Sequence, residues 1–305
     1  MKIILCTTFR EFKENENDQL QYAFLDSIKK QSYQDFLFVT TTFGEKNVKG
    51  VVDGYFGEKS IVKNVDVPTE FRFSLTDVVL SAIEVAEQCD DRSIIVWCTC
   101  DIVVESSFFQ KLVDNYVEGV SGIVHPNIIY ESIDALNLHR GKVGLLSEGI
   151  DLLFFDSAVL LKARQDVCDY RFYDWGVFEY FLVALSIGYS SLRVNLFNNT
   201  KIRKIVNDRE LTEETNDYFD RCNARNLPIL DKYVKAKGIA NNLSNIICYS
   251  AHISYIMKSF SFFYLYVKAK YVLFYTERGE ELRAKYHLTR VLDYFFKDKR
   301  VYYKS

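Results

Sequence analysis

The chain has 305 residues, of which 49% are hydrophobic and 26% are charged, with only 3 prolines and 13 glycines. These values fit a folded protein with one large α/β domain and an appendage, or two small domains, and they argue against long flexible linkers. The formal net charge of −3 conceals a basic tail, since residues 249–305 hold 11 Lys or Arg against 5 Asp or Glu.

Strands and helices alternate through the first 120 residues. Short apolar runs predict strands at Lys2–Thr7, Phe36–Thr40, Ile61–Val67 and Ser93–Cys98. Amphipathic spacing predicts helices at Asp18–Gln31, Ser74–Gln88 and Ser106–Tyr116. Ser74 is the expected N-cap of its helix, with Asp77 three residues further on. The alternation predicts a mostly parallel sheet flanked by helices.

The pattern continues beyond residue 120 with longer intervals. We expect strands at Gly122–Pro126, Asp151–Phe155 and Leu192–Phe197, and a helix at Asp174–Ile187. From Leu211 the sequence is helical and more charged, with Pro228 as an expected break. We therefore divide the chain into an α/β domain over residues 1–210 and a helical C-terminal region over residues 211–305.

Ligands of parallel α/β sheets bind at the carboxyl ends of the strands. Three polar segments follow expected strands at that edge: Thr7–Thr8, Thr40–Glu45 and Thr99–Asp101. No GxGxxG, Walker A, HExxH or GxSxG pattern occurs, which argues against dinucleotide enzymes, P-loop NTPases, zincins and α/β-hydrolases. We expect the three segments to form one binding site.

Three segments of this chain follow the order and spacing of a known family. They are residues 24–36 (FLDSIKKQSYQDF), residues 95–113, whose strand runs into Cys98-Thr99-Cys100-Asp101, and residues 173–178 (YDWGVF). They resemble the SILNQTYxxFE segment, the DxD strand with its following helix, and the EDWDxW segment of the large inverting family 2 type of GT-A glycosyltransferases. The resemblance covers residues 1–205 and implies a Rossmann-like nucleotide-sugar domain.

Asp101 stands where the DxD motif places its final Asp. By that resemblance it would contact the donor diphosphate through Mg²⁺ or Mn²⁺, which neutralises the charge left when the sugar departs. The family has two or more acids here, whereas this chain has one, so a metal would be held more weakly. The alternative is that Asp101 caps the turn after a strand.

Asp174 stands where the family places its catalytic base. Such a base removes the proton of the acceptor hydroxyl while that oxygen attacks the anomeric carbon. The usual Glu before it is Tyr173 here. Glu179 is the substitute candidate, and Asp151 is a candidate contact to a sugar hydroxyl. The alternative is that Asp174 is the N-cap of a helix that begins at Trp175.

The resemblance also implies a set of contacts to the donor nucleotide and its phosphates. Arg72 precedes a helix N-terminus suited to a phosphate, although a solvated surface Arg fits equally well. Lys201 lies where the family often carries a metal-binding His, so its charge would meet the diphosphate directly. The full set of expected donor contacts is Thr7, Thr8, Arg10, Thr41, Arg72, Thr99, Asp101 and Lys201.

The basic tail, residues 249–305, also holds 16 aromatic residues. Aromatic anchors beside Lys and Arg suit the headgroup zone of an anionic membrane leaflet, where the tail would meet a lipid-linked acceptor. The alternatives are that these aromatics pack on the catalytic domain or form a homo-oligomer interface. Nucleic acid is not expected as a partner, because the rest of the chain is acidic.

Cysteine usage and hydropathy favour the cytoplasm. Seven cysteines, mostly scattered, argue against a disulfide framework or a zinc site. The first apolar run is too short for a signal peptide, and no run of 18 apolar residues occurs. We expect a cytoplasmic protein whose tail rests peripherally on the inner face of the cell membrane.

These features together predict an inverting glycosyltransferase. It would move a sugar from a nucleoside diphosphate sugar to a glycan acceptor, in the synthesis of a lipid-linked surface polysaccharide. The main alternative is a non-catalytic GT-A-like module that binds a glycan or a nucleotide sugar, which the eroded acidic motifs favour. A nucleotidyltransferase ranks lower, because its glycine-rich basic loop after the first strand is missing.

Overall fold

The computed structural model describes most of the first 239 residues. The described ranges are 1–12, 16–89, 92–123, 128–130, 152–174, 178–194, 202–204 and 213–239. Asp151, Lys201 and the basic tail at 249–305 lie outside the described residues, so what was expected of them stays a prediction.

The main sheet has seven strands in the order β3-β2-β1-β4-β8-β6-β9. All neighbours are parallel except the two pairs that β8 makes, with β4 and with β6. A mostly parallel sheet is therefore confirmed, with one reversed strand that the sequence pattern did not indicate. The strands are β1 (Lys2–Thr7), β2 (Phe36–Thr42), β3 (Ser60–Asn64), β4 (Ser93–Cys98), β6 (Val120–Ile123), β8 (Leu152–Asp156) and β9 (Ser191–Val194).

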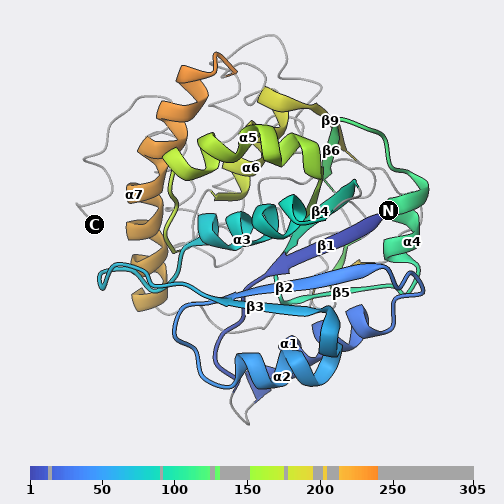
Figure 1. The fold of residues 1–305 in the computed structure, drawn as a ribbon. Coiled ribbons are helices and arrows are strands. Elements are labelled where there is room, and N and C mark those ends of the chain that lie inside the picture. The colour runs from blue at the N-terminus through green and yellow to red at the C-terminus, as the bar shows by residue number, and fades with distance from the viewer. Residues whose placement is uncertain are drawn as a thin grey trace.

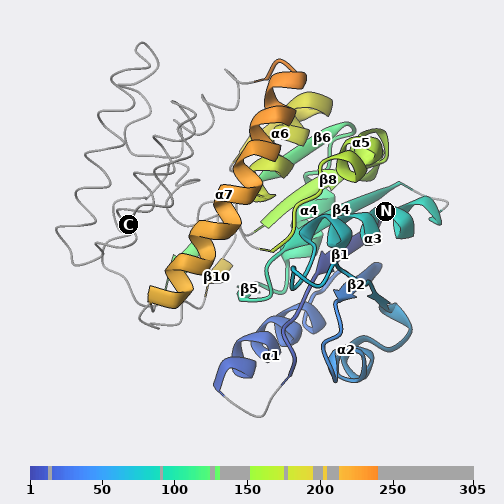
Figure 2. The same cartoon turned by 90° about the vertical axis from the view of Figure 1, so that its left-hand side faces the viewer.

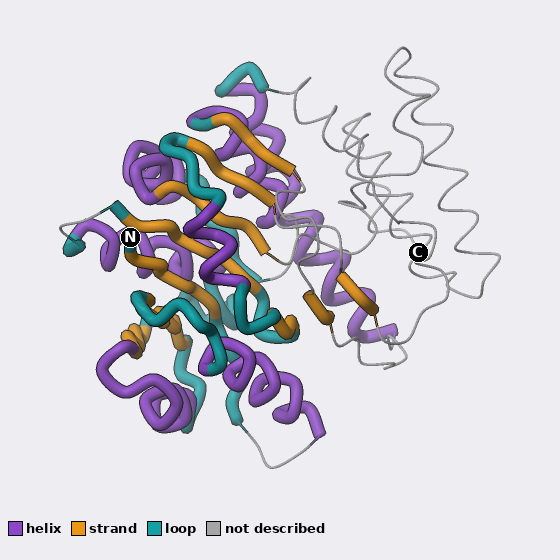
Figure 3. Tube along the Cα trace, turned by 90° about the vertical axis from the view of Figure 1, so that its right-hand side faces the viewer, coloured by secondary structure: helices purple, strands orange, loops and turns teal. Residues whose placement is uncertain are grey.

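Helices cover both faces of the sheet (Figures 1 and 3). One face carries α1 (Glu16–Lys29), α2 (Val48–Phe56), the short 3-10 turn Gly57–Lys59 and α4 (Phe108–Asp114). The other carries α3 (Leu75–Glu87), α5 (Ser157–Asp169) and α6 (Phe178–Tyr189). Successive side chains of β1 point to opposite faces of the sheet and pack in different cores. Ile3 and Leu5 belong to the core on the α1 side, and Ile4 and Cys6 belong to the core on the α3 side.

The start of α3 follows the sequence expectation. The Ser74 hydroxyl accepts a hydrogen bond from the Asp77 N–H at 3.2 Å, which confirms Ser74 as the N-cap. The Asp77 carboxylate accepts from Arg171 at 3.1 Å. Because α3 follows β3 and runs back to β4, its N-terminus lies at the carboxyl edge of the parallel strands.

A second, three-stranded sheet was not expected from the sequence. It consists of β5 (Ile102–Val104), β10 (Ile202–Lys204) and β7 (Ile128–Tyr130), with β10 in the middle. Lys204 pairs with Ile102 in an antiparallel register, so the backbone at residue 204 lies beside the residue that follows Asp101. The sheet therefore places the backbone of residues 202–204 beside β5, which follows the turn that carries Asp101.

Helix α7 (Glu213–Ala236) corrects one expectation. It runs through Pro228, so the predicted break there is wrong. A proline inside a helix loses one backbone hydrogen bond, and burial of Tyr233 and Val234 against α6 compensates for that loss. Helix α7 packs alongside α6 (Figure 2) and shares its core. The expected division of the chain into residues 1–210 and 211–305 stays a prediction.

Within the described ranges, no helix combines the length and the apolar character needed to cross a bilayer.

Candidate active site

The carboxyl ends of β1, β2 and β4 carry buried hydroxyls that have no partner. Thr7 and Thr40 are register neighbours on β1 and β2, and Thr99 follows β4. Among the described residues, the hydroxyls of all three are buried without a hydrogen-bond partner. Such groups are uncommon in folded proteins because each loses its water without a replacement. They mark this edge as a place where a polar ligand or water would complete the structure.

Two charged residues, Arg10 and Asp101, lie near the Cys100 thiol at the same edge of the sheet. The Arg10 N–H donates to Gln21 Oε1 at 2.9 Å, and Cys100 Sγ lies 3.9 Å from that same oxygen. Burial and, to a smaller extent, the negative charge of Asp101 raise the pKa of the Cys100 thiol, and the positive charge of Arg10 opposes them, with a net pKa of about 12. The side chains of Arg10 and Asp101 therefore lie within electrostatic reach of one thiol. We call Thr7, Thr99, Arg10 and Asp101 the donor edge.

Asp101 is the one expected metal ligand on the donor edge. It is half-buried, in the turn between β4 and β5. In the part of the chain that the structure describes, no group of three His, Cys, Asp or Glu side chains gathers closely enough to hold a metal ion. The described side chains therefore do not build a complete site for Mg²⁺ or Mn²⁺, and the expected cofactor stays a prediction.

Thr8 and Thr41 differ in what they offer to a ligand. The Thr8 hydroxyl donates to the Thr41 carbonyl at 2.8 Å. The Thr41 side chain is fully buried under α3, where its hydroxyl donates to Ser81 Oγ at 3.0 Å. In this structure the Thr41 hydroxyl is therefore engaged beneath α3, and its expected contact to a nucleotide stays a prediction. Thr8 is half-buried and keeps its place beside the edge.

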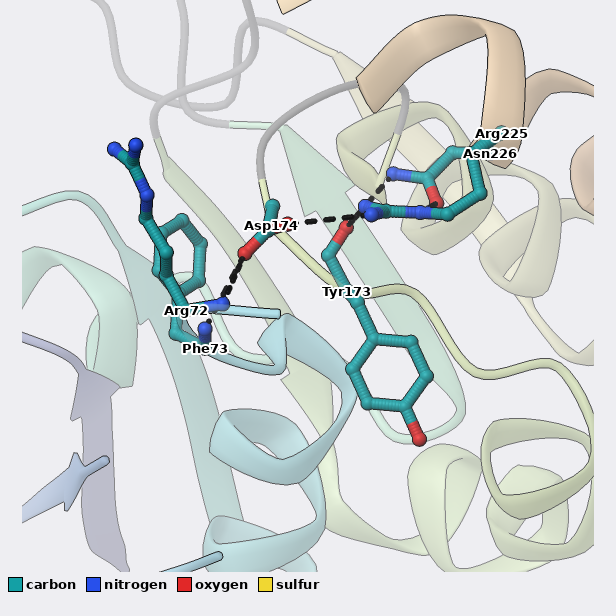
Figure 4. A network of polar contacts seen from close by, with 6 residues as sticks. All are labelled: Arg72, Phe73, Tyr173, Asp174, Arg225 and Asn226. Carbon is teal, nitrogen blue, oxygen red and sulfur yellow. Dashed lines mark hydrogen bonds and ion pairs between the residues drawn. The ribbon is translucent and has the colours of Figure 1, made fainter. Parts of the chain in front are cut away.

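Asp174 is held by groups that are far away in the sequence (Figure 4). Its side chain is buried, and its backbone has a φ of 52°, a left-handed conformation that Asp tolerates better than most residues. Its Oδ1 accepts from the N–H of Arg72 at 2.8 Å and of Phe73 at 3.3 Å. Its own N–H donates to the Phe73 carbonyl at 2.9 Å. The expected helix is present as α6 from Phe178, and residues 175–177 lie outside the described residues.

Helix α7 supplies the remaining partners of this network. Arg225 Nη1 donates to Asp174 Oδ2 at 3.2 Å, and Nη2 donates to the Tyr173 carbonyl. Asn226 Nδ2 donates to the same carbonyl at 3.1 Å. We call these residues, with Arg72 and Phe73, the Asp174 network. Sequence reasoning missed Arg225 and Asn226, because no local pattern connects residues 51 positions apart.

The two groups of residues share one edge of the sheet. Phe73, whose backbone holds Asp174, contacts the ring of Phe43 with 6.3 Å between centroids, and Phe43 directly follows β2. Since β1, β2 and β4 are parallel neighbours, the Asp174 network lies on the same side as the donor edge.

Arg72 and Glu179 are the two remaining candidates from the sequence. Arg72 contributes its backbone N–H to Asp174, while its exposed guanidinium extends away from that carboxylate (Figure 4). Glu179 is half-buried in the first turn of α6. Both remain candidates: Arg72 for a phosphate contact and Glu179 for a substitute base.

Comparison with known proteins supports the fold. No protein-family model and no curated protein sequence matches this chain. Residues 1–349 of TarS from S. aureus match with a TM-score of 0.55 at 10% identity, over 99% of this chain and 89% of that one. The mannosyltransferase PcManGT from Pyrobaculum calidifontis, in complex with GDP-Man and Mn²⁺, matches with a TM-score of 0.48 at 11% identity, over 97% and 87%. The second likeness is too weak to support an inference. The chain has the α/β fold of GT-A glycosyltransferases, with a mostly parallel mixed sheet between helices.

Proposed function

We propose that this protein is a glycosyltransferase that moves a sugar from a nucleoside diphosphate sugar to a glycan acceptor. The observation that carries the proposal is the donor edge, where the partnerless buried hydroxyls of Thr7 and Thr99 lie at the ends of adjacent strands, beside Arg10 and Asp101. A nucleotide sugar offers the hydroxyl, carbonyl and phosphate oxygens that such groups bind.

On the donor side, the charge of Arg10 would attract the diphosphate. The bond that breaks joins the anomeric carbon to a diphosphate oxygen, and the negative charge stays on that oxygen. Positive groups placed at that oxygen lower the barrier. Asp101 is the candidate ligand if Mg²⁺ or Mn²⁺ binds with the donor, and the cation would take its other ligands from phosphate oxygens and water.

On the acceptor side, Asp174 is the proposed base. The acceptor oxygen would bond to the anomeric carbon while its proton passes to the carboxylate, and attack from the face opposite the diphosphate gives inversion. Asp174 accepts from two donors on Oδ1 and from one on Oδ2, which favours Oδ2 as the oxygen that takes the proton. Glu179 is the substitute. The lipid-linked polysaccharide acceptor and the contact of the tail with the inner face of the cell membrane belong to the same proposal.

The first test is a thermal-shift screen of nucleoside diphosphates and their sugars, with and without Mn²⁺. UDP, which TarS holds in one of its structures, belongs in that panel. A specific ligand raises the melting temperature by mass action. Donor hydrolysis and sugar transfer are then measured for whichever nucleotide binds. If no nucleotide diphosphate shifts the melting temperature, the donor edge is not a nucleotide site.

Asp101→Asn tests whether turnover depends on the donor edge rather than on acidic residues elsewhere on the surface. We expect kcat/KM for the donor to fall about 10²-fold, since the proposed protein ligand of the cation that would neutralise the departing diphosphate is lost. The matched control is Asp114→Asn, an exposed acid on α4, which should leave turnover unchanged. Equal turnover in the two variants would remove Asp101 from the site.

A non-catalytic module that binds nucleotide sugars is the second candidate. Two observations favour it: among the described residues no group of three metal-ligating side chains includes Asp101, and both oxygens of the Asp174 carboxylate already accept hydrogen bonds. Tight nucleotide binding without hydrolysis or transfer, across acceptors and with Mn²⁺ present, would decide for this candidate.

A further inference from the structure

We propose that Arg225 is a positioning residue for Asp174, so that helix α7 completes the acceptor side of the active site. The catalytic meaning of this proposal rests on the transferase function proposed above. Its geometry rests on contacts between three segments that are distant in the chain: residues 71–73, residues 173–174 and the middle of α7 (Figure 4).

The planar guanidinium of Arg225 donates three hydrogen bonds. Nη1 donates to Asp174 Oδ2 at 3.2 Å, Nη2 donates to the Tyr173 carbonyl, and Nε donates to Asn226 Oδ1 at 3.2 Å. A planar fork can hold a carboxylate and a neighbouring carbonyl at once, whereas the ammonium of a lysine is a point charge on a flexible chain. The contact therefore fixes the direction of the hydrogen bonds to Asp174 and Tyr173 as well as supplying a positive charge.

Aromatic rings fix the plane of that fork. The Cζ atom of Arg225 lies 4.5 Å from the centroid of the Phe71 ring. Phe71 in turn stacks on Tyr173 with 4.1 Å between ring centroids and 4° between planes. Because Tyr173 directly precedes Asp174, this stack ties the guanidinium to the backbone that carries the carboxylate.

Arg225 also distinguishes the two oxygens of Asp174. The backbone N–H groups of Arg72 and Phe73 hold Oδ1, and Arg225 is the donor to Oδ2. Without Arg225, the carboxylate would be fixed at one oxygen and could rotate about the bond that carries it. A base must meet the acceptor proton at hydrogen-bond distance, and a displacement of about 1 Å can lower the rate 10²-fold.

The test compares Arg225→Lys and Arg225→Met with a matched control, Lys237→Met. Lys237 directly follows α7, and its Nζ lies 2.7 Å from Asp166 Oδ2. The two cations are equally exposed, with 30% of the Arg225 side chain and 32% of the Lys237 side chain accessible. Both changes weaken the docking of α7, but only the first touches Asp174.

We expect Arg225→Met to lower kcat about 10²-fold with the donor KM unchanged. Arg225→Lys should recover less than a tenth of the lost kcat, since it keeps the charge and loses the fork. Lys237→Met should lower the melting temperature by less and keep kcat. The proposal is overturned if the Arg225 and Lys237 variants lose kcat equally, or if Arg225→Lys restores it.

A double-mutant cycle in thermal unfolding separates this proposal from the proposed function. If Arg225 holds Asp174, the melting temperature of Arg225→Met with Asp174→Asn should fall by less than the sum of the single changes. A wild-type chain that binds nucleotide sugars without turnover would end the transferase proposal and the positioning role with it. Additive losses in the cycle would instead show that the two side chains do not interact, whatever the activity.

Discussion

The donor edge and the Asp174 network satisfy their polar groups in opposite ways. At the donor edge, the hydroxyls of Thr7 and Thr99 are buried without a partner among the described residues. In the Asp174 network, both carboxylate oxygens have donors, and these come from two segments that are distant from Asp174 in the chain. The first arrangement leaves polar groups that a ligand or water could satisfy, whereas the second joins segments of the protein to one another. We therefore expect substitutions at the donor edge to change the stability of the protein less than substitutions in the Asp174 network.

The largest expected effect is that of Asp174→Ala. We expect transfer to fall about 10³-fold through loss of the base. The variant should also unfold with about 2–3 kcal/mol less free energy, because Arg225 and two N–H groups lose their acceptor. Activity and urea denaturation give the two values.

Asp174→Asn is the control for that change. It keeps one acceptor oxygen for the backbone N–H groups, so the stability loss should be smaller while transfer is lost to the same extent. If Asp174→Asn retains transfer, Asp174 is structural alone, and Glu179 becomes the base to test.

Valine substitutions at Thr7 and Thr99 test whether the donor-edge hydroxyls serve a ligand rather than the stability of the protein. Thr7→Val and Thr99→Val remove hydroxyls that have no partner, so each should leave stability equal or about 1 kcal/mol higher. Nucleotide affinity should fall by about 5- to 10-fold in each. Urea denaturation and nucleotide titration measure the two effects.

Thr41→Val is the matched control, because its hydroxyl donates to Ser81 beneath α3. It should lose about 1 kcal/mol of stability and bind nucleotide as before. The contrast would fail if Thr7→Val destabilised the protein as much as Thr41→Val does, since its hydroxyl would then already have a partner in the free protein.

The smallest expected effect is a pH dependence at the end of α7. The hydrogen bonds from Lys237 to Asp166 and then to Tyr189 raise the pKa of the Lys237 ammonium. A raised folded pKa means that this contribution is complete below the unfolded pKa of about 10.4 and is lost as pH rises through the folded pKa. It should amount to less than about 1 kcal/mol, because Lys237 is one-third exposed.

Melting temperatures of the wild type and Lys237→Met between pH 8 and pH 11 measure that contribution. The difference between the two proteins should be constant at the lower pH and shrink at the upper end. A difference that stays constant across the range would mean that the Lys237 charge contributes nothing to stability.

The sequence by itself determined the elements whose signals are local. The apolar runs of β1 and β4, the amphipathic spacing of α1 and the capping hydroxyl of Ser74 each lie within a few residues of what they specify. Alternation of those elements then indicated a parallel sheet, and the strand-end rule indicated where Thr7, Thr99 and Asp101 would gather.

Only the tertiary structure decided the rest, because those features depend on contacts between distant residues. The sequence placed Thr41 among the expected donor contacts, and only the structure shows that its hydroxyl donates to Ser81 beneath α3. Helix α7 continues through Pro228 because its other face is buried against α6, which outweighs a local rule. Arg225 meets Asp174 across 51 residues, and the N–H of Arg72 meets it across 102. No local periodicity specifies such pairs, since folding of the whole core brings them together.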